Sequence, residues 1–381
     1  MKVIPLYLPQ FHTIPENDKW WGKGFTEWVN VRNAKPLFEG HNQPRVPLNN
    51  NYYDLSDVET LKWQCKLAKD HGIYGFCMYH YWFNGHLLLE KPMEILLAHP
   101  EIDIKYCISW ANGEWRDIWK SSDNASSKIL IADDFNNEQG WVDHFNYMLP
   151  FFKDSRYMSE NNKPILVIYS PHIIIKLNKM LDLWTKMAQD AGFDGLTYIY
   201  QSASSSFDKS WDRSKFEYGV EMNPGYVTMK HHSPNKILTS KYLKYIREIK
   251  RILGINRSLV SAPKVSSVKT MDYDDVWQDI LKLRPSESTK MIPCAFTDWD
   301  NTPRHQIRGS AYIDVTTEKF KHYFALLLEN AHKYYHSDKV FIFAWNEWAE
   351  GGYLEPDELY QYGFLNAIKE ALDNFKANKD E

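Results

Sequence analysis

Eight short apolar runs recur along this chain of 381 residues, and their number and spacing limit its fold more than any other feature. They cover residues 3–8, 74–82, 104–110, 164–169, 197–201, 219–222, 291–296 and 340–345. Most of these runs are almost continuously apolar, which is typical of parallel strands that are covered on both faces. The runs therefore predict eight buried, parallel strands.

Segments with helical periodicity separate most of these runs, at residues 56–71, 172–191, 241–253, 272–283, 317–335 and 358–375. The first segment begins with Ser56 and Glu59 in the spacing of a capping box and ends at Gly72. The second segment also ends at a glycine, Gly192. Eight strands that alternate with helices predict an α/β fold, a (β/α)8 TIM barrel.

The excess length of the chain predicts enlarged loops on this barrel. A minimal barrel needs roughly 250 residues, so about 130 residues remain. Much of this excess follows strand ends, at residues 9–55, 111–140 and 222–239, where the loops of such a barrel line the catalytic face. An open doubly wound sheet is the alternative, but no glycine-rich phosphate loop follows an early strand. We therefore expect one catalytic barrel domain over residues 1–381.

Charge and cysteine usage narrow the class of protein further. The net charge of −4 leaves no broad basic field for nucleic acid or anionic lipid. The four cysteines form no C-x-x-C pair and predict small buried side chains in a reducing compartment. No apolar run reaches about 18 residues and no signal peptide is evident, so we expect a cytoplasmic protein that is not an integral membrane protein. The sequence predicts no cofactor and does not indicate an oligomeric state.

The last apolar run leads directly into two carboxylates, Glu347 and Glu350, which alternate with Trp345, Asn346 and Trp348. Acidic side chains at the end of a buried strand are costly unless they are paired, solvated or used. Paired carboxylates beside indole rings suit glycosidic-bond chemistry, in which one acts as acid and the other as base or nucleophile. A solvated surface turn is the simpler alternative for this spacing.

Similar mixtures of aromatic and polar side chains follow the other strand ends. Sugars present C–H faces and hydroxyl groups, so a sugar site needs both kinds of side chain at once. The candidate substrate-binding residues are Tyr7, Gln10, His12, Trp21, Glu27, Trp28, His80, Tyr81, Trp82, Trp110, Asn112, Trp115, Asp298, Trp299, Arg304, Trp345, Asn346 and Trp348.

Each of these clusters also has a simpler explanation. His12 and His80 are equally compatible with satisfied core histidines, and Trp21 with packing under a long loop. A metal site built from His12, His80, Asp298 and a glutamate remains an alternative, although no ligand spacing supports it. Arg304 is either a surface charge or a partner for a carboxylate or an acidic sugar.

Several of these motifs, in the same order along nearly the whole chain, resemble those of WbsX-type proteins of bacterial surface-polysaccharide gene clusters. They are residues 7–12 (YLPQFH), 20–28 (WWGKGFTEW), 79–83 (YHYWF), 110–112 (WAN), 299–304 (WDNTPR) and 344–351 (AWNEWAEG). The members of that family are commonly regarded as glycosyltransferases. It is more distantly similar to the endo-α-mannosidases of glycoside hydrolase family 99, which are (β/α)8 barrels with two glutamates three residues apart after the last strand.

The resemblance implies roles for the two glutamates. Glu347 matches the base for the substrate's own 2-hydroxyl, which attacks the anomeric carbon to form a 1,2-anhydro sugar. Glu350 matches the general acid on the leaving oxygen, which then becomes the base for the incoming group, with retention of configuration. We find no obvious protein nucleophile; Glu27, Glu114 and Asp298 are the carboxylates that would overturn this mechanism.

Three functions remain open at this stage. The first is a glycosidase or transglycosylase that acts on α-glycosidic bonds of an O-antigen or capsule polysaccharide. The second is a glycosyltransferase of polysaccharide biosynthesis, although neither a Rossmann-like sheet nor a diphosphate site is evident. The third is a barrel that binds a glycan without catalysis. In each case, we expect an oligosaccharide or polysaccharide partner.

Overall fold

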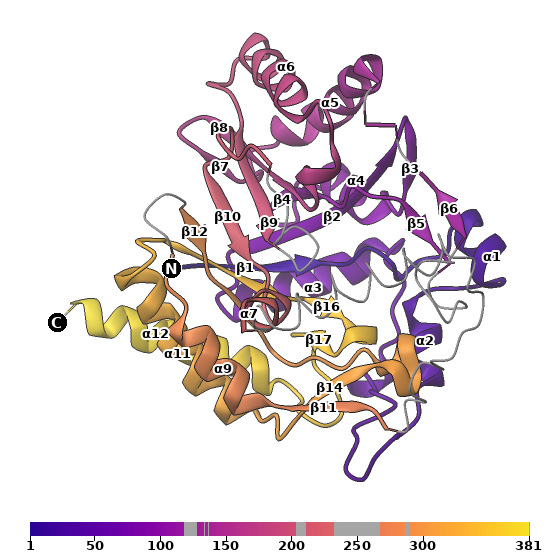
Figure 1. Ribbon diagram of the computed structural model, residues 1–381, viewed down its shortest axis with the longest axis vertical. Coiled ribbons are helices and arrows are strands. Elements are labelled where there is room, and N and C mark those ends of the chain that lie inside the picture. Colours follow the sequence, from indigo (N-terminus) through magenta and orange to yellow (C-terminus); the bar gives the residue numbers. More distant parts are fainter. Residues whose placement is uncertain are drawn as a thin grey trace, which may run out of the picture.

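A parallel β-barrel lies at the centre of the computed structural model, which describes residues 1–117, 128–132, 134–135, 137–202, 211–231, 267–285 and 290–380 (Figure 1). Its strands are β1 (Lys2–Tyr7), β2 (Gly75–Phe83), β4 (Lys105–Trp110), β8 (Lys163–Ile168), β9 (Thr197–Ser202), β10 (Tyr218–Glu221), β12 (Met291–Ile292), β13 (Cys294–Phe296) and β15 (Lys339–Phe343). Neighbouring barrel strands pair in parallel in the order β12-β10-β9-β8-β4-β2-β1-β15-β13. Each of the eight predicted strands is therefore confirmed.

The predicted run at residues 291–296 is divided into two strands at Pro293, and this division closes the barrel. β12 pairs with β10 on one side, whereas β13 pairs with β15 on the other. Proline has no backbone N–H to contribute to a ladder, but the carbonyl of Pro293 accepts a hydrogen bond from the Phe341 amide at 3.0 Å. The two half-strands together occupy the seventh barrel position.

Helices cover the outside of the barrel, and most predicted helices are present with different ends. α3 (Val58–Asp70), α6 (Leu177–Asp190), α9 (Tyr273–Lys282), α11 (Thr317–Lys333) and α12 (Gly363–Asp380) match predicted segments. The segment at residues 241–253 lies outside the described residues. α9, α11 and α12 lie together on one flank, and α5 (Glu138–Phe152) lies beside α6 on another (Figure 1).

Three helical predictions were wrong in detail. Asp57, not Ser56, caps α3, since its side chain accepts a hydrogen bond from the Glu59 amide at 3.0 Å. α6 and α12 each begin five residues later than predicted, after irregular segments at their amino ends. The sequence analysis did not predict α5, which contains Pro150, or α4 (Lys91–Ala98), which has Pro92 in its first turn. Proline inside a segment argues against a continuous helix.

The loops after the strands carry further short elements that surround the carboxyl ends of the barrel. They are α1 (Pro15–Trp21), α2 (Glu27–Asn33), η1 (Leu48–Asn50), β3 (His86–Leu88), β5 (Trp115–Arg116), β6 (Ile129–Ile131), η3 (Pro171–Ile173), α7 (Gly225–His231), β11 (Lys269–Asp272), α10 (Thr302–His305), η4 (Gln306–Arg308), β14 (Ser310–Ile313), β16 (Asn346–Glu347), η5 (Trp348–Glu350) and β17 (Gly352–Tyr353). A further short strand, β7 (Ser159–Glu160), precedes β8. The enlarged loops predicted from chain length are therefore present.

The four cysteines are buried and unpaired, as predicted; they are Cys65, Cys77, Cys107 and Cys294. Burial raises the pKa of the Cys65 and Cys294 thiols to about 12, so both remain neutral and behave as small apolar side chains. Among the residues that the structure describes, no helix combines the length and apolar character needed to span a membrane.

Candidate active site

The two glutamates lie in a tight turn that follows β15. Asn346 and Glu347 form β16, which pairs antiparallel with β17, and Glu350 ends the short helix η5 between them. Gly351 closes the turn with a φ of +73°, and a Cβ atom there would lie 2.8 Å from the Asp300 amide nitrogen. Glycine is therefore required directly after Glu350, both for its backbone conformation and for the space.

Buried hydrogen bonds fix this turn to the rest of the barrel. The Asn346 side chain accepts from the Leu8 amide at 2.8 Å and donates to the Leu8 carbonyl at 2.9 Å, which joins the last strand to the first. The Trp348 indole donates to Glu355 at 2.7 Å and stacks on Tyr353, with ring centroids 3.9 Å apart. Asn346 and Trp348, both predicted to bind substrate, thus hold the turn in place.

Glu355 lies beneath this turn as a buried acceptor, and the sequence reasoning missed it. Its carboxylate also accepts from the Tyr53 hydroxyl at 2.7 Å and from Gln64 Nε2 at 2.6 Å. Burial raises the pKa of Glu355 to about 7, while these donors lower it. A buried carboxylate with several donors fixes the groups that bind it, so Glu355 orients Trp348.

Arg304 lies between the two site glutamates. Its Nη2 atom is 3.2 Å from Glu347 Oε2, and its Nη1 atom pairs with Glu350 Oε1. On its other edge, Nε and Nη2 each lie 3.2 Å from an oxygen of Glu27, whose side chain is completely buried. Of the two explanations offered for Arg304, a surface charge or a partner for a carboxylate, the structure thus favours the second, with three glutamates as partners.

Burial gives the two glutamates an unusual protonation behaviour. It raises the pKa of Glu347 to about 8, and the charges of Glu350 and Glu27 add to the rise while Arg304 opposes it. Burial likewise raises the pKa of Glu350, again against the effect of Arg304. The site therefore retains a proton at neutral pH, which a general acid requires.

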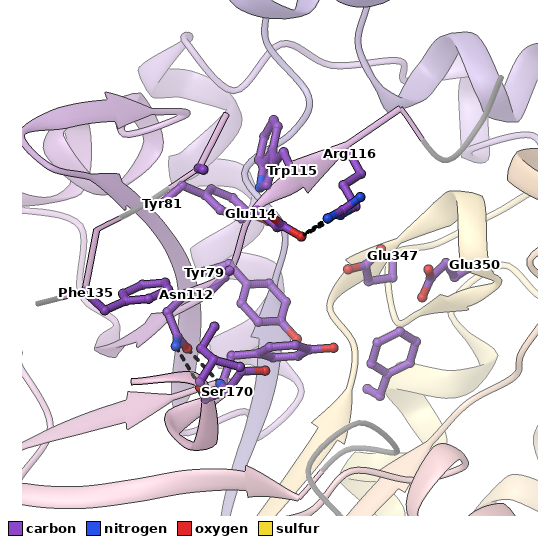
Figure 2. A pocket seen from close by; sticks show the side chains of 16 residues that line it. Tyr79, Tyr81, Asn112, Glu114, Trp115, Arg116, Phe135, Ser170, Glu347 and Glu350 are labelled. Atoms are coloured by element: carbon purple, nitrogen blue, oxygen red, sulfur yellow. Dashed lines mark hydrogen bonds and ion pairs between the residues drawn. The ribbon is translucent and has the colours of Figure 1, made fainter. Parts of the chain in front are cut away.

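A cavity of about 690 Å3 opens beside Glu347 and Glu350. Figure 2 shows the two glutamates along one side and Tyr81, Asn112 and Trp115 on the other. A second cavity of about 330 Å3, lined by Gln10, Trp21 and Arg304, shares Tyr81, Trp115 and Glu347 with the first. A third of about 370 Å3, lined by Trp299, Ser310 and Tyr312, shares Tyr79, Tyr169 and Glu350 with it. The hollow surface thus continues on both sides of the glutamates.

The structure divides the candidate site residues into two groups. Those that line the three cavities are Gln10, Trp21, Tyr81, Asn112, Trp115, Trp299, Arg304, Glu347 and Glu350. Those that are buried and do not line them are Tyr7, His12, Glu27, Trp28, His80, Trp82, Trp110, Asp298, Trp345, Asn346 and Trp348.

Several members of the buried group have structural partners instead. The Tyr7 hydroxyl donates to Gln64 at 2.7 Å, and the Trp28 indole donates to the Tyr53 carbonyl at 2.8 Å. The Nε2 atoms of His80 and His144 are 2.9 Å apart, and burial lowers the pKa of His80 to about 3, so it stays neutral. His80 is therefore a core histidine, the simpler of its two explanations.

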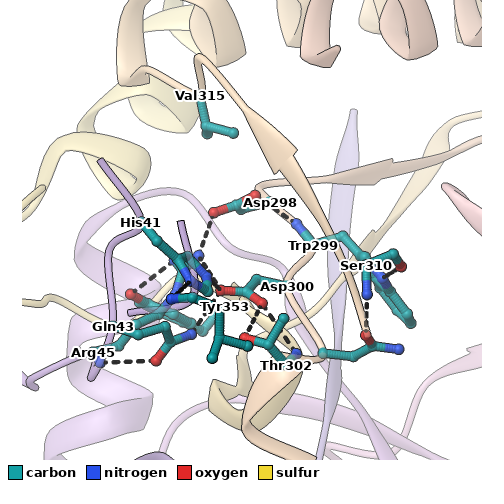
Figure 3. Close-up of polar contacts among 12 residues, drawn as sticks. His41, Gln43, Arg45, Asp298, Trp299, Asp300, Thr302, Ser310, Val315 and Tyr353 are labelled. Carbon is teal, nitrogen blue, oxygen red and sulfur yellow. Dashed lines mark hydrogen bonds and ion pairs between the residues drawn. The ribbon is translucent and has the colours of Figure 1, made fainter. Parts of the chain in front are cut away.

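Asp298 belongs to a separate polar cluster. Its Oδ2 atom is 2.6 Å from Nη2 of Arg45 (Figure 3). Asp298 also lines another cavity, of about 600 Å3. Within the described residues, no group of three His, Cys, Asp or Glu side chains is arranged to hold a metal ion.

The cavity also contains residues that the candidate set omitted, above all Tyr79 and Tyr169. Burial raises the pKa of Tyr169 to about 12, and the charges of Glu350 and Glu347 contribute to the rise, so this phenol stays neutral near both carboxylates. Two sequence signals point to these residues. Tyr79 shares a strand face with Tyr81, because side chains alternate along β2, and Tyr169 directly follows β8.

Comparison with known proteins identifies the family to which the chain belongs. Residues 3–368 match the sequence model of the family "Glycosyltransferase WbsX", so the chain belongs to the WbsX glycosyltransferase family. Two relatives are both called uncharacterized protein WxcX, one from each of two strains of Xanthomonas campestris pv. campestris. Each is 31% identical to this chain over 380 residues. The alignment covers 97% of this chain but 49% of each relative, so the chain spans about half of their length.

Solved structures support the barrel fold. The GH99 endo-alpha-mannosidase from Bacteroides thetaiotaomicron aligns with a TM-score of 0.55 and 10% identity, over 100% of this chain and 98% of that one. A protein described as glycoside hydrolase-like aligns with a TM-score of 0.51 and 15% identity, over 91% of this chain and 99% of that one. At these identities, the likeness concerns the fold alone.

Proposed function

We propose that this chain acts on α-glycosidic bonds of a bacterial surface polysaccharide of the O-antigen or capsule type, with retention of configuration. The observation that carries the proposal is the pair of glutamates, Glu347 buried and Glu350 half-buried, joined by one arginine at the side of a cavity with aromatic walls. Aromatic rings suit the C–H faces of sugars, and paired carboxylates suit proton transfer at the glycosidic oxygen.

In this proposal, the proton that the pair retains lies on Glu350 in the reactive state, so Glu347 is ionised. Glu347 then removes the proton of the sugar's 2-hydroxyl, and that oxygen attacks the anomeric carbon. Glu350 donates a proton to the leaving oxygen as the glycosidic bond breaks, which yields a 1,2-anhydro sugar. Glu350 then takes the proton of water or of an acceptor hydroxyl, which attacks the anomeric carbon, while Glu347 returns its proton to the 2-oxygen. Each carboxylate ends in its starting state.

The positions of the other carboxylates favour this mechanism over one with a protein nucleophile. Glu27 is enclosed behind Arg304, and Asp298 is bound to Arg45 outside the three cavities. Glu114 does line the cavity, and Arg116 pairs with it at 2.5 Å. We expect Glu114→Gln to change activity less than tenfold; a loss equal to that of Glu347→Gln would make Glu114 the nucleophile.

The hollow on both sides of the glutamates favours an internal position in a longer glycan. The three cavities share residues in pairs, through Glu347 on one side and Glu350 on the other. A chain of sugars that crosses the glutamates would fill all three, as endo-acting or transglycosylase-like chemistry requires. The unpaired buried cysteines suit a reducing compartment, so the proposal places the enzyme in the cytoplasm.

A glycosyltransferase that uses a nucleotide sugar is the second candidate, and the family name favours it. The charges around the main cavity argue against it. Among the described residues that line this cavity, Glu114, Glu347 and Glu350 face a single arginine, Arg116. Arg304 lies beside this cavity, but it is already paired with Glu27, Glu347 and Glu350. A diphosphate would meet repulsion there rather than the cations or helix amino ends that usually bind it.

The deciding experiment is incubation with α-linked manno-, rhamno- and fuco-oligosaccharides, with and without nucleotide sugars, followed by mass spectrometry. Shorter or rearranged products without a nucleotide, absent with Glu350→Gln, would support the proposal. Extension that strictly requires a nucleotide sugar would replace it with the second candidate. Tight binding of an intact glycan without turnover by the wild type would indicate a binding protein.

A further inference from the structure

Arg304 does more than neutralise one carboxylate, because its contacts are distributed over its whole guanidinium group. Nη1 pairs with Glu350, Nη2 lies 3.2 Å from both Glu347 and Glu27, and Nε lies 3.2 Å from Glu27. A guanidinium is planar and permanently charged, so fixing one edge fixes the direction of the other. The two site glutamates therefore receive donors in a set geometry.

Glu27 is the fixed end of this arrangement. Its side chain is completely buried, and Oε2 accepts a second hydrogen bond from Asn30 Nδ2 at 3.3 Å. The neighbouring Trp28 packs on Trp348, with ring centroids 5.4 Å apart, so α2 also supports the turn that carries Glu350. Glu27 cannot reach a substrate in the cavity; its carboxylate orients Arg304.

The charge of this group explains why such an orientation matters. Three ionised carboxylates around one arginine would leave two net negative charges in a buried site, which is costly. Retaining a proton on Glu347 or Glu350 reduces this cost. Since Nη1 contacts one of the two and Nη2 the other, whichever carboxylate loses the proton already has a cationic partner.

We propose that Arg304, anchored on Glu27, is a positioning residue that keeps Glu347 and Glu350 as a pair sharing one proton. This inference rests on the proposed function, in which Glu350 alternately gives and takes a proton while Glu347 does the reverse. The fork of Arg304 supports both charge states of the pair without moving. Its sequence signal is the motif at residues 299–304, which brings Arg304 back toward the strand-eight turn.

Other ionisable groups face this pair from the surrounding elements. They are Tyr79 and Tyr81 from β2, Glu114 and Arg116 from the loop after β4, and Tyr169 after β8. His305, next to Arg304 in the chain, interacts with that arginine. Burial raises the pKa of the Tyr79 phenol and lowers the pKa of His305, so both are neutral near pH 7. The alternating charge is therefore carried by the glutamates.

The test follows the shared proton directly and needs no substrate. Infrared spectra across pH record the band of protonated carboxyl groups, and subtracting the spectrum of Glu347→Gln removes the background from Glu355 and Glu221, whose pKa values burial also raises to about 7. In the wild type, we expect this band at neutral pH and its loss in alkali. Glu27→Gln should move the midpoint down, and Arg304→Gln should move it up, each by about one pH unit or more.

The two opposite shifts separate this role from a merely structural one. Arg304→Lys, which keeps a charge but not the fork, should keep the midpoint within half a unit while lowering kcat more than it raises KM. Glu329→Gln, an exposed acid on α11, is the control and should change nothing. Equal midpoints in Glu27→Gln, Arg304→Gln and wild type would overturn the inference. Shifted midpoints in a protein that turns over no glycan would instead overturn the proposed function and leave the inference standing.

Discussion

The turn with Glu347 and Glu350 and the cluster around Asp298 and Asp300 contain the same chemical groups but differ in their use. Both hold two carboxylates beside an arginine, of which Glu350 is half-buried and the other three are buried. Asp300, however, accepts from His41 at 2.8 Å, from Gln43 at 2.7 Å and from the Thr302 hydroxyl at 2.6 Å (Figure 3). The site glutamates instead open onto an aromatic cavity.

This difference appears in the pKa values of Asp300 and Glu347. Burial raises the pKa of Asp298 despite Arg45. Burial acts in the same direction on Asp300, but the many donors of Asp300 and Arg45 outweigh it and bring the pKa of Asp300 down to about 2. For Glu347, burial prevails and the pKa rises to about 8. Burial beside an arginine is therefore not enough to make a carboxylate reactive. The carboxylate must also have too few hydrogen-bond donors to stabilise its charge and must be accessible from a cavity.

The two regions are nevertheless connected. The Asp300 amide donates to the Glu350 carbonyl at 2.7 Å, and Gly351 lies against the same backbone. The cluster around Asp298 and Asp300 thus supports the turn that carries Glu347 and Glu350. Substitutions in the two regions should therefore separate into losses of activity and losses of stability.

The largest expected effect is on activity. Glu350→Gln should lower the rate on an unactivated oligosaccharide by roughly 10³-fold, because it removes the proton donor while preserving shape. Asp298→Asn, the matched change in the other cluster, should lower it by less than tenfold. Initial rates of both variants measure this contrast, and equal losses would erase the distinction between the two regions.

A large effect on stability is expected from Asp300→Asn. Asparagine keeps one acceptor oxygen but has no charge, so Arg45 and His41 lose their shared anionic partner, which should cost about 3 kcal/mol of the free energy of unfolding. Glu350→Gln should change this free energy by less than about 1 kcal/mol. Urea unfolding followed by tryptophan fluorescence compares the two; a Glu350→Gln protein that is less stable than Asp300→Asn would contradict the assignment.

The contributions of Glu347 and Asp300 to stability should depend on pH with opposite signs. Since the folded pKa of Glu347 is raised to about 8, its contribution is full below its unfolded pKa and is lost as the pH rises through 8. Since the folded pKa of Asp300 is lowered to about 2, its contribution is present above its unfolded pKa and is lost as the pH falls through 2. Unfolding free energies of Glu347→Gln should therefore decline less between pH 5 and 8 than those of the wild type.

The smallest effect is expected at the far end of the hollow. Trp299→Ala removes an aromatic wall of the third cavity, so it should raise KM for longer oligosaccharides about tenfold and leave the shortest cleavable substrate unchanged. Steady-state kinetics over a length series would show this. A uniform increase in KM at every length would mean that Trp299 does not mark a separate sugar position.

Much of the fold could be predicted because burial on both faces leaves an unmistakable pattern in parallel strands. The division of the seventh strand at Pro293 and the later start of α12 could not be predicted, because they depend on packing between distant segments. In the site, the glutamate pair and Arg304 followed from motifs at strand ends.

The sequence was less able to distinguish cavity from core. Along β2, Tyr79 and Tyr81 face the cavity, whereas His80 and Trp82 point away from it toward His144. The period of two along a strand carries this information, but choosing between the two faces requires the register of the barrel. Glu355 had no local signal at all, because its partners come from distant segments.

The most direct test of the central claim compares Glu350→Gln on two substrates that differ only in their leaving group. A dinitrophenyl glycoside needs no proton on its leaving oxygen, whereas the matched unactivated oligosaccharide does. The account predicts that kcat/KM, which reports the first step, falls roughly 10³-fold on the oligosaccharide and less than tenfold on the dinitrophenyl glycoside. Equal losses on both substrates would contradict Glu350 as the proton donor.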